Sequence, residues 1–125
     1  MKVVAAVIER DGRVLICQRK GGRHALKWEF PGGKVEADET PQVALARELR
    51  EELALDARIG DEIHRHQVRY GNGPIIFLMF YRVTDFSGEP KNLQFAQIVW
   101  EERRKLPEYD FLEGDVEFVR MLAGR

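Results

Sequence analysis

Three glutamates close together in the sequence, Glu48, Glu51 and Glu52, are the residues most suited to chemistry. Positions three and four apart are neighbours on a helix, so a helix here places the three carboxylates on one face. Carboxylates this close repel one another. A divalent cation such as Mg²⁺, which binds oxygen ligands, removes that repulsion. The spacing indicates a metal site, and the alternative is an ordinary solvated acidic face.

Two glycines precede the acidic stretch and favour the metal site over the solvated face. Gly32 and Gly33 allow the backbone or a ligand to come close, because glycine has no side chain. We expect a glycine-rich turn here, with its backbone carbonyls exposed. The Gly33 carbonyl and the glutamate carboxylates together then form a cradle of oxygen atoms for a cation.

The helix that must position these carboxylates has a clear beginning. Thr40 offers a hydroxyl N-cap, and Pro41 suits the first helical position, where its missing N–H costs nothing. Leu45, Leu49 and Leu53 recur every four residues, which is typical of an apolar stripe facing a core. The sequence therefore predicts a helix over residues 41–53.

The fixed residues around this helix resemble the Nudix box. They are Gly33, five residues, Glu39, seven residues, Arg47-Glu48-Leu49, one residue, Glu51-Glu52, one residue and Ala54-Leu55. One position departs from the box, because Ala54 stands where the box has Gly. That departure concerns the end of the helix, where Gly is the usual residue, more than the carboxylates. The resemblance implies an α+β protein with the Nudix fold, a mixed β-sheet sandwiched between helices.

The resemblance also implies roles for the residues of the box. In a Nudix hydrolase Gly33, Glu48, Glu51 and Glu52 would hold Mg²⁺, with Mn²⁺ as a substitute, and Arg47 would belong to the catalytic group. The general base would be Glu48 or Glu51, and the sequence leaves this choice open. A structural ion pair between Glu39 and Arg47 would fix the loop against the helix and orient the ligands, as outer-shell partners do.

The segment W-E-F-P-G-G-K, which begins at Trp28, resembles the MutT-like branch of the family. That branch implies binding of a small nucleotide, and two further residues match positions that contact it. Arg19 would bind phosphate or a base carbonyl through its fork of donors, or it makes an ordinary surface salt bridge. Asp115 would accept a hydrogen bond from an exocyclic amine such as N4 of cytosine, or it caps the last helix. Both alternatives stay open for each residue.

The remaining candidates for the substrate site lie before the box. Phe30, Val3 and Ala5 could line an apolar slot for the base, with Phe30 as a stacking face, or they pack in the core. Residues 20–27 contain two glycines and four basic residues, one of which is His24. They form a lid that faces the phosphates or an ordinary solvated loop.

A second departure concerns the metal. Some relatives supply one more glutamate ligand from a loop that precedes the last strand, and Gln94 occupies the corresponding place here. Gln offers a neutral oxygen in place of a charge. Glu89 is the nearest upstream carboxylate. The number of metal ions is therefore left open.

Length and composition are those of a globular protein. The chain has 125 residues, of which 44% are hydrophobic and 33% charged, so we expect one domain over residues 1–125. The net charge of -1 argues against a stable complex with nucleic acid. The single cysteine, Cys17, excludes an internal disulfide and is expected to be buried. No apolar run approaches the roughly 20 residues of a membrane span, and no signal peptide is evident, so we expect a cytoplasmic protein. The expected oligomeric state is a monomer or a homodimer.

The other elements follow from apolar patterning and turn residues. We predict a hairpin of residues 2–9 and 13–19 around Asp11-Gly12, strand-like stretches over 56–70, a turn at 71–74, a central strand buried on both faces over 75–83, a loop over 85–90, a strand over 95–100, a helical turn over 101–106, a connector over 107–111 and a helix over 115–122.

The resemblance implies hydrolysis of a nucleoside triphosphate by water to the monophosphate and pyrophosphate. Cytidine-type or oxidised nucleotides are the expected substrates, which implies sanitation of the nucleotide pool and a part in DNA repair. Two alternatives remain at this point. One is a Nudix hydrolase of another nucleoside-diphosphate-X substrate, and the other is a non-catalytic nucleotide-sensing domain.

Overall fold

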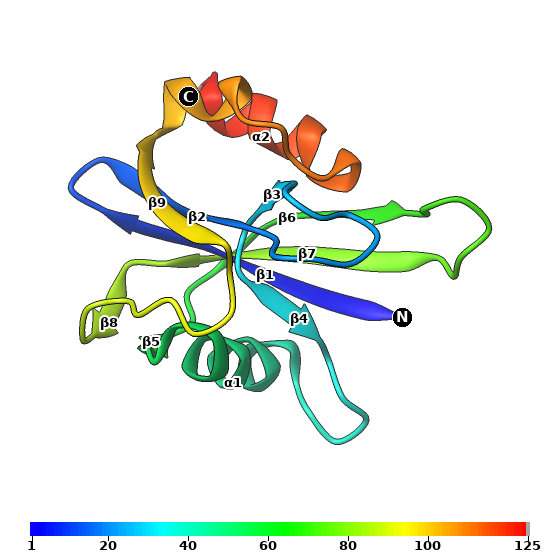
Figure 1. Ribbon diagram of the computed structural model, residues 1–125. Helices are drawn as coiled ribbons and strands as arrows, with labels where there is room; N and C mark the ends of the chain where they lie inside the picture. The colour runs from blue at the N-terminus through cyan, green and yellow to red at the C-terminus, as the bar shows by residue number, and fades with distance from the viewer. Residues whose placement is uncertain (125) are drawn as a thin grey trace.

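A mixed β-sheet lies between two α-helices in the computed structural model, which describes residues 1–124 (Figure 1). The elements in chain order are β1 (Lys2–Arg10), β2 (Arg13–Gln18), β3 (Trp28–Glu29), β4 (Gly32–Lys34), α1 (Pro41–Leu53), β5 (Asp56–Arg58), β6 (Glu62–Val68), β7 (Ile76–Val83), β8 (Asp85–Ser87), β9 (Gln97–Glu102), two 3₁₀ segments (Arg103–Glu108 and Glu113–Asp115) and α2 (Val116–Ala123).

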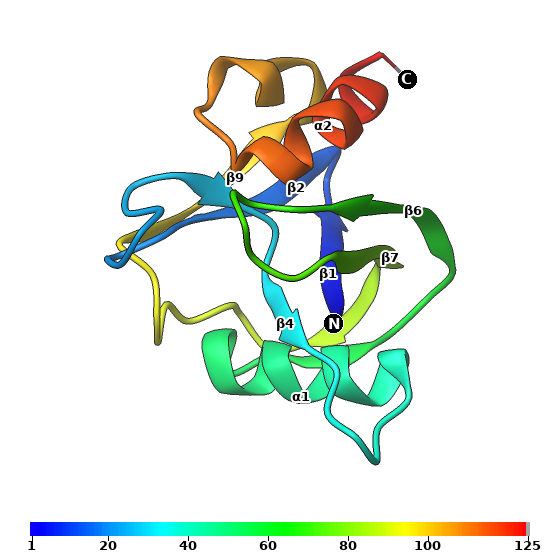
Figure 2. The ribbon, with the colours of Figure 1, turned by 90° about the vertical axis from the view of Figure 1, so that its right-hand side faces the viewer.

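Strand β1 is at the centre of the sheet. The order of neighbours is β3-β2-β1-β7-β6, with β4 paired to β1 and β9 paired to β2. The pair β1–β7 is parallel and the pair β1–β2 is antiparallel, which makes the sheet mixed. Strands β5 and β8 form a separate small sheet. The expected α+β architecture with a mixed sheet between helices is confirmed (Figure 2).

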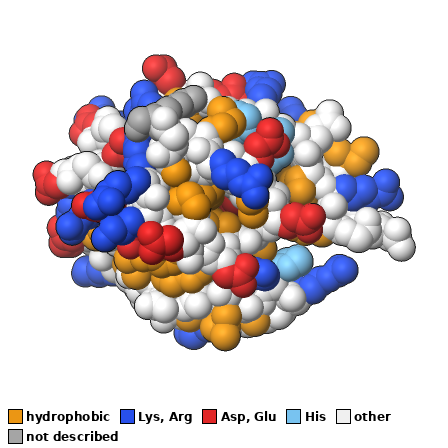
Figure 3. All heavy atoms as spheres, turned by 90° about the horizontal axis from the view of Figure 1, so that it is seen from above, with side chains coloured by type: hydrophobic (Ala, Val, Ile, Leu, Met, Phe, Trp, Pro, Cys, Tyr) orange, Lys and Arg blue, Asp and Glu red, His pale blue; other side chains and the backbone are white. Residues whose placement is uncertain are grey.

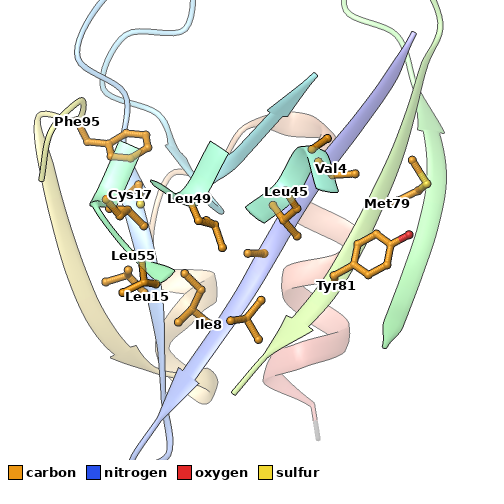
Figure 4. Close-up of a cluster of buried hydrophobic side chains, with 14 residues drawn as sticks. Val4, Ile8, Leu15, Cys17, Leu45, Leu49, Leu55, Met79, Tyr81 and Phe95 are labelled. Atoms are coloured by element: carbon orange, nitrogen blue, oxygen red, sulfur yellow. The ribbon is translucent and has the colours of Figure 1, made fainter. Parts of the chain in front are cut away.

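Alternate residues of β1 supply two separate cores, one on each face of the sheet. Val4, Ala6 and Ile8 pack with helix α1, whereas Ala5 and Val7 pack with helix α2. Figure 4 shows the α1 side, where labelled side chains from the helix and the strands meet. Such burial on both faces holds the two helices on opposite sides of one sheet.

Helix α1 begins and ends as its sequence indicates. Thr40 Oγ1 accepts a hydrogen bond from the Val43 N–H at 3.2 Å, and Pro41 is the first helical residue. The stripe of Leu45, Leu49 and Leu53 is fully buried. Ala54 takes the left-handed conformation at the C-cap, with φ 53° and ψ 35°. Alanine therefore takes the left-handed conformation that glycine usually provides at this position.

Several predicted elements are confirmed, among them the β1–β2 hairpin, the helix over 41–53 and the central position of β7. Other bounds are shifted, because the last strand is Gln97–Glu102 and the helical turn is the 3₁₀ segment Arg103–Glu108, which runs into the expected connector. Among residues 1–124, no helix is long and apolar enough to cross a membrane.

Two predictions about loops are wrong. Gly32 and Gly33 do not form a turn, because they belong to strand β4, which pairs antiparallel with Val4 and Ala5 of β1. A Cβ on Gly32 would lie 1.9 Å from the Val4 carbonyl oxygen, so only glycine permits this approach. Part of the expected loop over 85–90 is strand β8, paired with β5. Both strands have three residues, too few for a periodic pattern.

We expect Ala54→Gly to stabilise the protein by about 0.5–1 kcal/mol. A left-handed conformation costs a residue with a Cβ roughly 1–2 kcal/mol, and the extra freedom of glycine in the unfolded chain offsets part of the gain. Urea unfolding measures the difference. The matched control is Ala46→Gly inside α1, which should destabilise by about 1 kcal/mol. A loss of stability in Ala54→Gly would contradict this explanation.

Candidate active site

Strand β4 and helix α1 bring the diglycine pair against the glutamates. A Cβ on Gly33 would lie 2.5 Å from Cδ of Glu48, so the carboxylate of Glu48 packs directly on the glycine backbone. The Gly32 N–H donates to Glu52 Oε1 at 3.2 Å. The glycines and two of the three predicted carboxylates are therefore neighbours, although the glycines belong to a strand.

Glu52 is a buried carboxyl group surrounded by negative charge. Its residue is 5% exposed. Burial, together with the charges of Glu48 and Glu29, raises the pKa of Glu52 to about 9. Gln94, which stands where some relatives have a glutamate, donates from Nε2 to Glu52 Oε2 at 3.4 Å. It therefore contacts the site through its amide nitrogen. The local charge favours either a proton on Glu52 or a bound cation.

Arg47 joins the loop before α1 to the acidic face. It makes two hydrogen bonds to Glu39, from Nε at 2.6 Å and from Nη2 at 2.8 Å. The hydrogen bonds to Arg47 lower the pKa of Glu39 to about 2. Arg47 also donates to Glu48 Oε1 at 3.0 Å and to the Lys34 carbonyl at 3.2 Å. The structure thus contains the ion pair between Glu39 and Arg47 that the sequence suggested. The additional bond from Arg47 fixes the side chain of Glu48.

Glu51 differs from the other two glutamates. Its side chain is 57% exposed and accepts from Arg47 Nη1 at 3.3 Å. Glu51 is also not among the residues that line the cavity at Glu48 and Glu52. Its role as a metal ligand or base stays a prediction.

One cavity of about 540 Å³ contains most of the predicted site residues. Its walls come from the sheet, from α1, from the loop over 20–27 and from the segment that precedes α2. The residues in these walls include Val3, Ala5, Arg19, His24, Glu29, Phe30, Gly33, Lys34, Glu48, Glu52, Val68, Tyr70, Gln94, Leu112 and Asp115.

Arg19 and Asp115 lie on this cavity, and the structure bears on their alternatives. Arg19 Nη1 makes a salt bridge to Glu29 Oε1 at 3.0 Å while it lines the cavity, so the salt bridge is present and binding of the substrate by Arg19 stays a prediction. Asp115 is 5% exposed and directly precedes α2, yet its side chain makes no capping hydrogen bond. Burial, with a contribution from the charge of Glu29, raises the pKa of Asp115 to about 8.

The apolar candidates belong to both the cavity and the core. Phe30 is 4% exposed, and its ring packs against Phe80, Phe111 and Phe118 with centroid distances of 5.9, 5.4 and 5.6 Å. Val3 and Ala5 line the cavity beside it. Core packing accounts for most contacts of Phe30, and a stacking role stays a prediction.

Among the cavity residues that were not singled out from the sequence, three have polar or charged side chains, namely Glu29, Lys34 and Tyr70. Glu29 has a side chain 18% exposed, and burial raises its pKa despite the salt bridge with Arg19. A charged residue between Trp28 and Phe30 was the available signal for Glu29, because a carboxylate flanked by large buried side chains needs a partner. Tyr70, next to a turn, offered no signal.

A family model described as the NUDIX domain matches residues 1–122. The chain belongs to the Nudix family. The Nudix chain is 42% identical over 117 residues to the CTP pyrophosphohydrolase of Escherichia coli, and the match covers 93% of this chain and 86% of that protein. It is 35% identical over 124 residues to the 8-oxo-dGTP diphosphatase of Haemophilus influenzae, and this match covers 98% of this chain and 90% of that protein.

Solved structures agree with this membership in the Nudix family. The solution structure of the E. coli ORF135 protein has a TM-score of 0.86 at 41% identity and covers 95% of this chain and 85% of that one. The crystal structure of the MutT Nudix hydrolase from Burkholderia pseudomallei has a TM-score of 0.84 at 28% identity and covers 98% and 95%. The chain is therefore a Nudix pyrophosphohydrolase rather than a non-catalytic sensing domain.

Nudix hydrolases generally need a divalent metal, and the donor atoms here suit one. Across residues 1–124, no three His, Cys, Asp or Glu side chains are grouped closely enough to form a ready metal cluster. Glu48 and Glu52 nevertheless line one cavity beside the Gly33 backbone, and burial together with the charge of Glu48 raises the pKa of Glu52. Oxygen donors with excess negative charge are what hard divalent cations bind.

We expect the metal-free protein to lose stability as the pH rises from about 4.5 towards 9. An ordinary glutamate carboxyl has a pKa of 4.5, whereas Glu52 has a pKa of about 9 in the fold. The folded state therefore binds more protons than the unfolded state across this range, and its stability falls with pH. Asp115, with a pKa of about 8, adds to the fall.

Thermal unfolding in chelator at a series of pH values measures this slope. Glu52→Gln, which has the same shape and no ionisable proton, should flatten it. The same slope in wild type and Glu52→Gln would show that Glu52 is not the buried acid described here.

Proposed function

We propose that this enzyme hydrolyses a nucleoside triphosphate with water to the monophosphate and pyrophosphate, using Mg²⁺. We infer cytidine-type or oxidised nucleotides as its substrates. The observation that carries the proposal is one cavity with Glu48 and Glu52 in its wall and buried Asp115 in the same wall. The names of the two relatives, one acting on CTP and one on 8-oxo-dGTP, support the substrate class. Residues 1–125 then act as a single Nudix domain.

Glu48, Glu52 and the Gly33 carbonyl would hold the cation, with Mn²⁺ as a substitute and Glu51 as an additional ligand. A bound divalent ion would neutralise phosphate charge and make a water molecule more acidic. Arg47 keeps Glu48 oriented through its bonds to Glu39 and Glu48. Between the two candidate bases, the position of Glu48 in the cavity wall favours Glu48 over the exposed Glu51.

Arg19 and Lys34 supply positive charge to the cavity and would bind the phosphate chain. Arg19 is held by Glu29, so its guanidinium is presented in a defined orientation. Basic residues of the loop over 20–27 extend this charge at the surface. On the face seen from the α2 side, Lys and Arg side chains are interspersed with Asp and Glu (Figure 3).

Asp115 is our candidate for reading the base. An ionised Asp115 accepts a hydrogen bond from the N4 amine of cytosine. A protonated carboxyl both donates and accepts, which suits the altered edge of an oxidised guanine. With a pKa near 8 in the fold, Asp115 is available in the protonated form at neutral pH. One side chain thereby accounts for both substrate types.

We expect purified protein with Mg²⁺ to release pyrophosphate, and not orthophosphate, from at least one of CTP, dCTP, 5-methyl-dCTP and 8-oxo-dGTP. Glu52→Gln should lower kcat about 100-fold or more, as loss of a group that stabilises developing charge does. Glu62→Gln, on β6 outside the cavity wall, is the matched control and should retain the wild-type rate. Release of orthophosphate would overturn the reaction proposed here.

Asp115→Asn tests base recognition separately from the reaction. In wild type, the ratio of kcat/KM for CTP to that for 8-oxo-dGTP should rise as the pH passes about 8, because Asp115 loses its donor. In Asp115→Asn the ratio should not follow pH, and at high pH it should favour 8-oxo-dGTP about tenfold more than wild type does. An unchanged preference at every pH would remove Asp115 from base reading.

A further inference from the structure

Gly114, the residue before Asp115, is held through both of its backbone polar groups. Its N–H donates to the Tyr70 hydroxyl at 3.0 Å. Its carbonyl is 2.7 Å from His66 Nε2. A carbonyl can only accept, so the proton of this second bond is on Nε2 of His66. Both partners lie more than 40 positions earlier in the sequence, with separations of 44 and 48 residues.

The approach is so close that a side chain at position 114 would force Tyr70 and Val68 to move. A Cβ on Gly114 would lie 2.5 Å from the Tyr70 hydroxyl oxygen and 2.9 Å from Cγ2 of Val68. The 3₁₀ segment Glu113–Asp115 therefore packs on β6 and on the residues that follow it. Helix α2, which follows this segment, covers the face of the sheet opposite α1 and shares its core with residues of β6 (Figures 1 and 2). Two hydrogen bonds and this contact fix the backbone that carries Asp115.

Tyr70 also forms part of the cavity. Tyr70, Val68, Leu112 and Asp115 all line it. The ring of His24, on the loop over 20–27, lies 5.0 Å from the ring of Tyr70. The ring of Tyr70 thus contacts the loop while its hydroxyl holds Gly114. Loss of the Tyr70 hydroxyl would release the 3₁₀ segment Glu113–Asp115, while the ring of Tyr70 would still line the cavity.

We propose that His66 and Tyr70 are positioning residues that set base selectivity, because they hold Gly114 and thereby keep the Asp115 carboxyl at a fixed place in the cavity. This proposal rests on the proposed function, in which Asp115 reads the base. Neither residue touches the metal-binding carboxylates. Their loss should therefore alter the choice among nucleotides more than the rate of the chemical step.

The test compares Tyr70→Phe, His66→Leu and His66→Gln with wild type, using kcat and KM for CTP and 8-oxo-dGTP. Tyr70→Phe and His66→Leu should each reduce the ratio of kcat/KM between the better and the poorer substrate about fivefold, the factor expected for one hydrogen bond. The loss should appear in KM, with kcat changed less than about twofold. His66→Gln, whose amide can donate to the Gly114 carbonyl, should restore most of the ratio.

The control is Tyr109→Phe, which removes another tyrosine hydroxyl bond, that to Glu101 at 2.5 Å, away from the cavity wall. It should leave the ratio unchanged. Amide exchange of Gly114, followed by NMR, should become faster in Tyr70→Phe and stay as in wild type in Tyr109→Phe.

The results separate this proposal from the one on which it depends. If wild type hydrolyses the nucleotides but the ratio is the same in Tyr70→Phe and His66→Leu, the positioning role is overturned while the proposed function stands. If wild type hydrolyses none of them, the proposed function fails, and the selectivity role fails with it. A fall in kcat alone, with the ratio preserved, also contradicts the proposal.

Discussion

The site depends on the repulsion between two carboxylates that the fold holds close together. Glu48 packs on the Gly33 backbone, and Glu52 accepts from the Gly32 N–H in a buried position. Burial, followed by the charge of Glu48, raises the pKa of Glu52 to about 9, so without a cation a proton on Glu52 relieves the repulsion. A divalent metal bound here would be attracted by the negative charge of Glu48 and Glu52, which the fold already holds close together.

The remaining architecture maintains this arrangement. The pairing of β4 with β1 fixes the glycines, and the buried leucine stripe of α1 fixes the helix that carries the glutamates. Arg47 bonds Glu39, Glu48 and Glu51 and so compensates part of the negative charge. The second core, beneath α2, places Asp115 in the wall of the same cavity. One sheet with a core on each face therefore brings the proposed metal-binding and base-reading groups together.

The sequence predicted what depends on local spacing. The helix of residues 41–53, its Thr40 cap and the pairing of Arg47 with Glu39 all follow from positions within one stretch. It did not predict strand β4, the burial of Glu29 or the two bonds to Gly114, because these depend on contacts between distant segments. The close approach at Gly32 and Gly33 was predicted, but the turn expected there is a strand.

Calorimetric titration of the metal-free protein with Mg²⁺ near pH 7.5, in two buffers of different ionisation enthalpy, tests the central claim most directly. A cation that binds between Glu48 and Glu52 must displace the proton that Glu52 holds at this pH. The account predicts release of close to one proton per bound Mg²⁺ in wild type and much less in Glu52→Gln. Binding of Mg²⁺ by wild type with no proton release would contradict it.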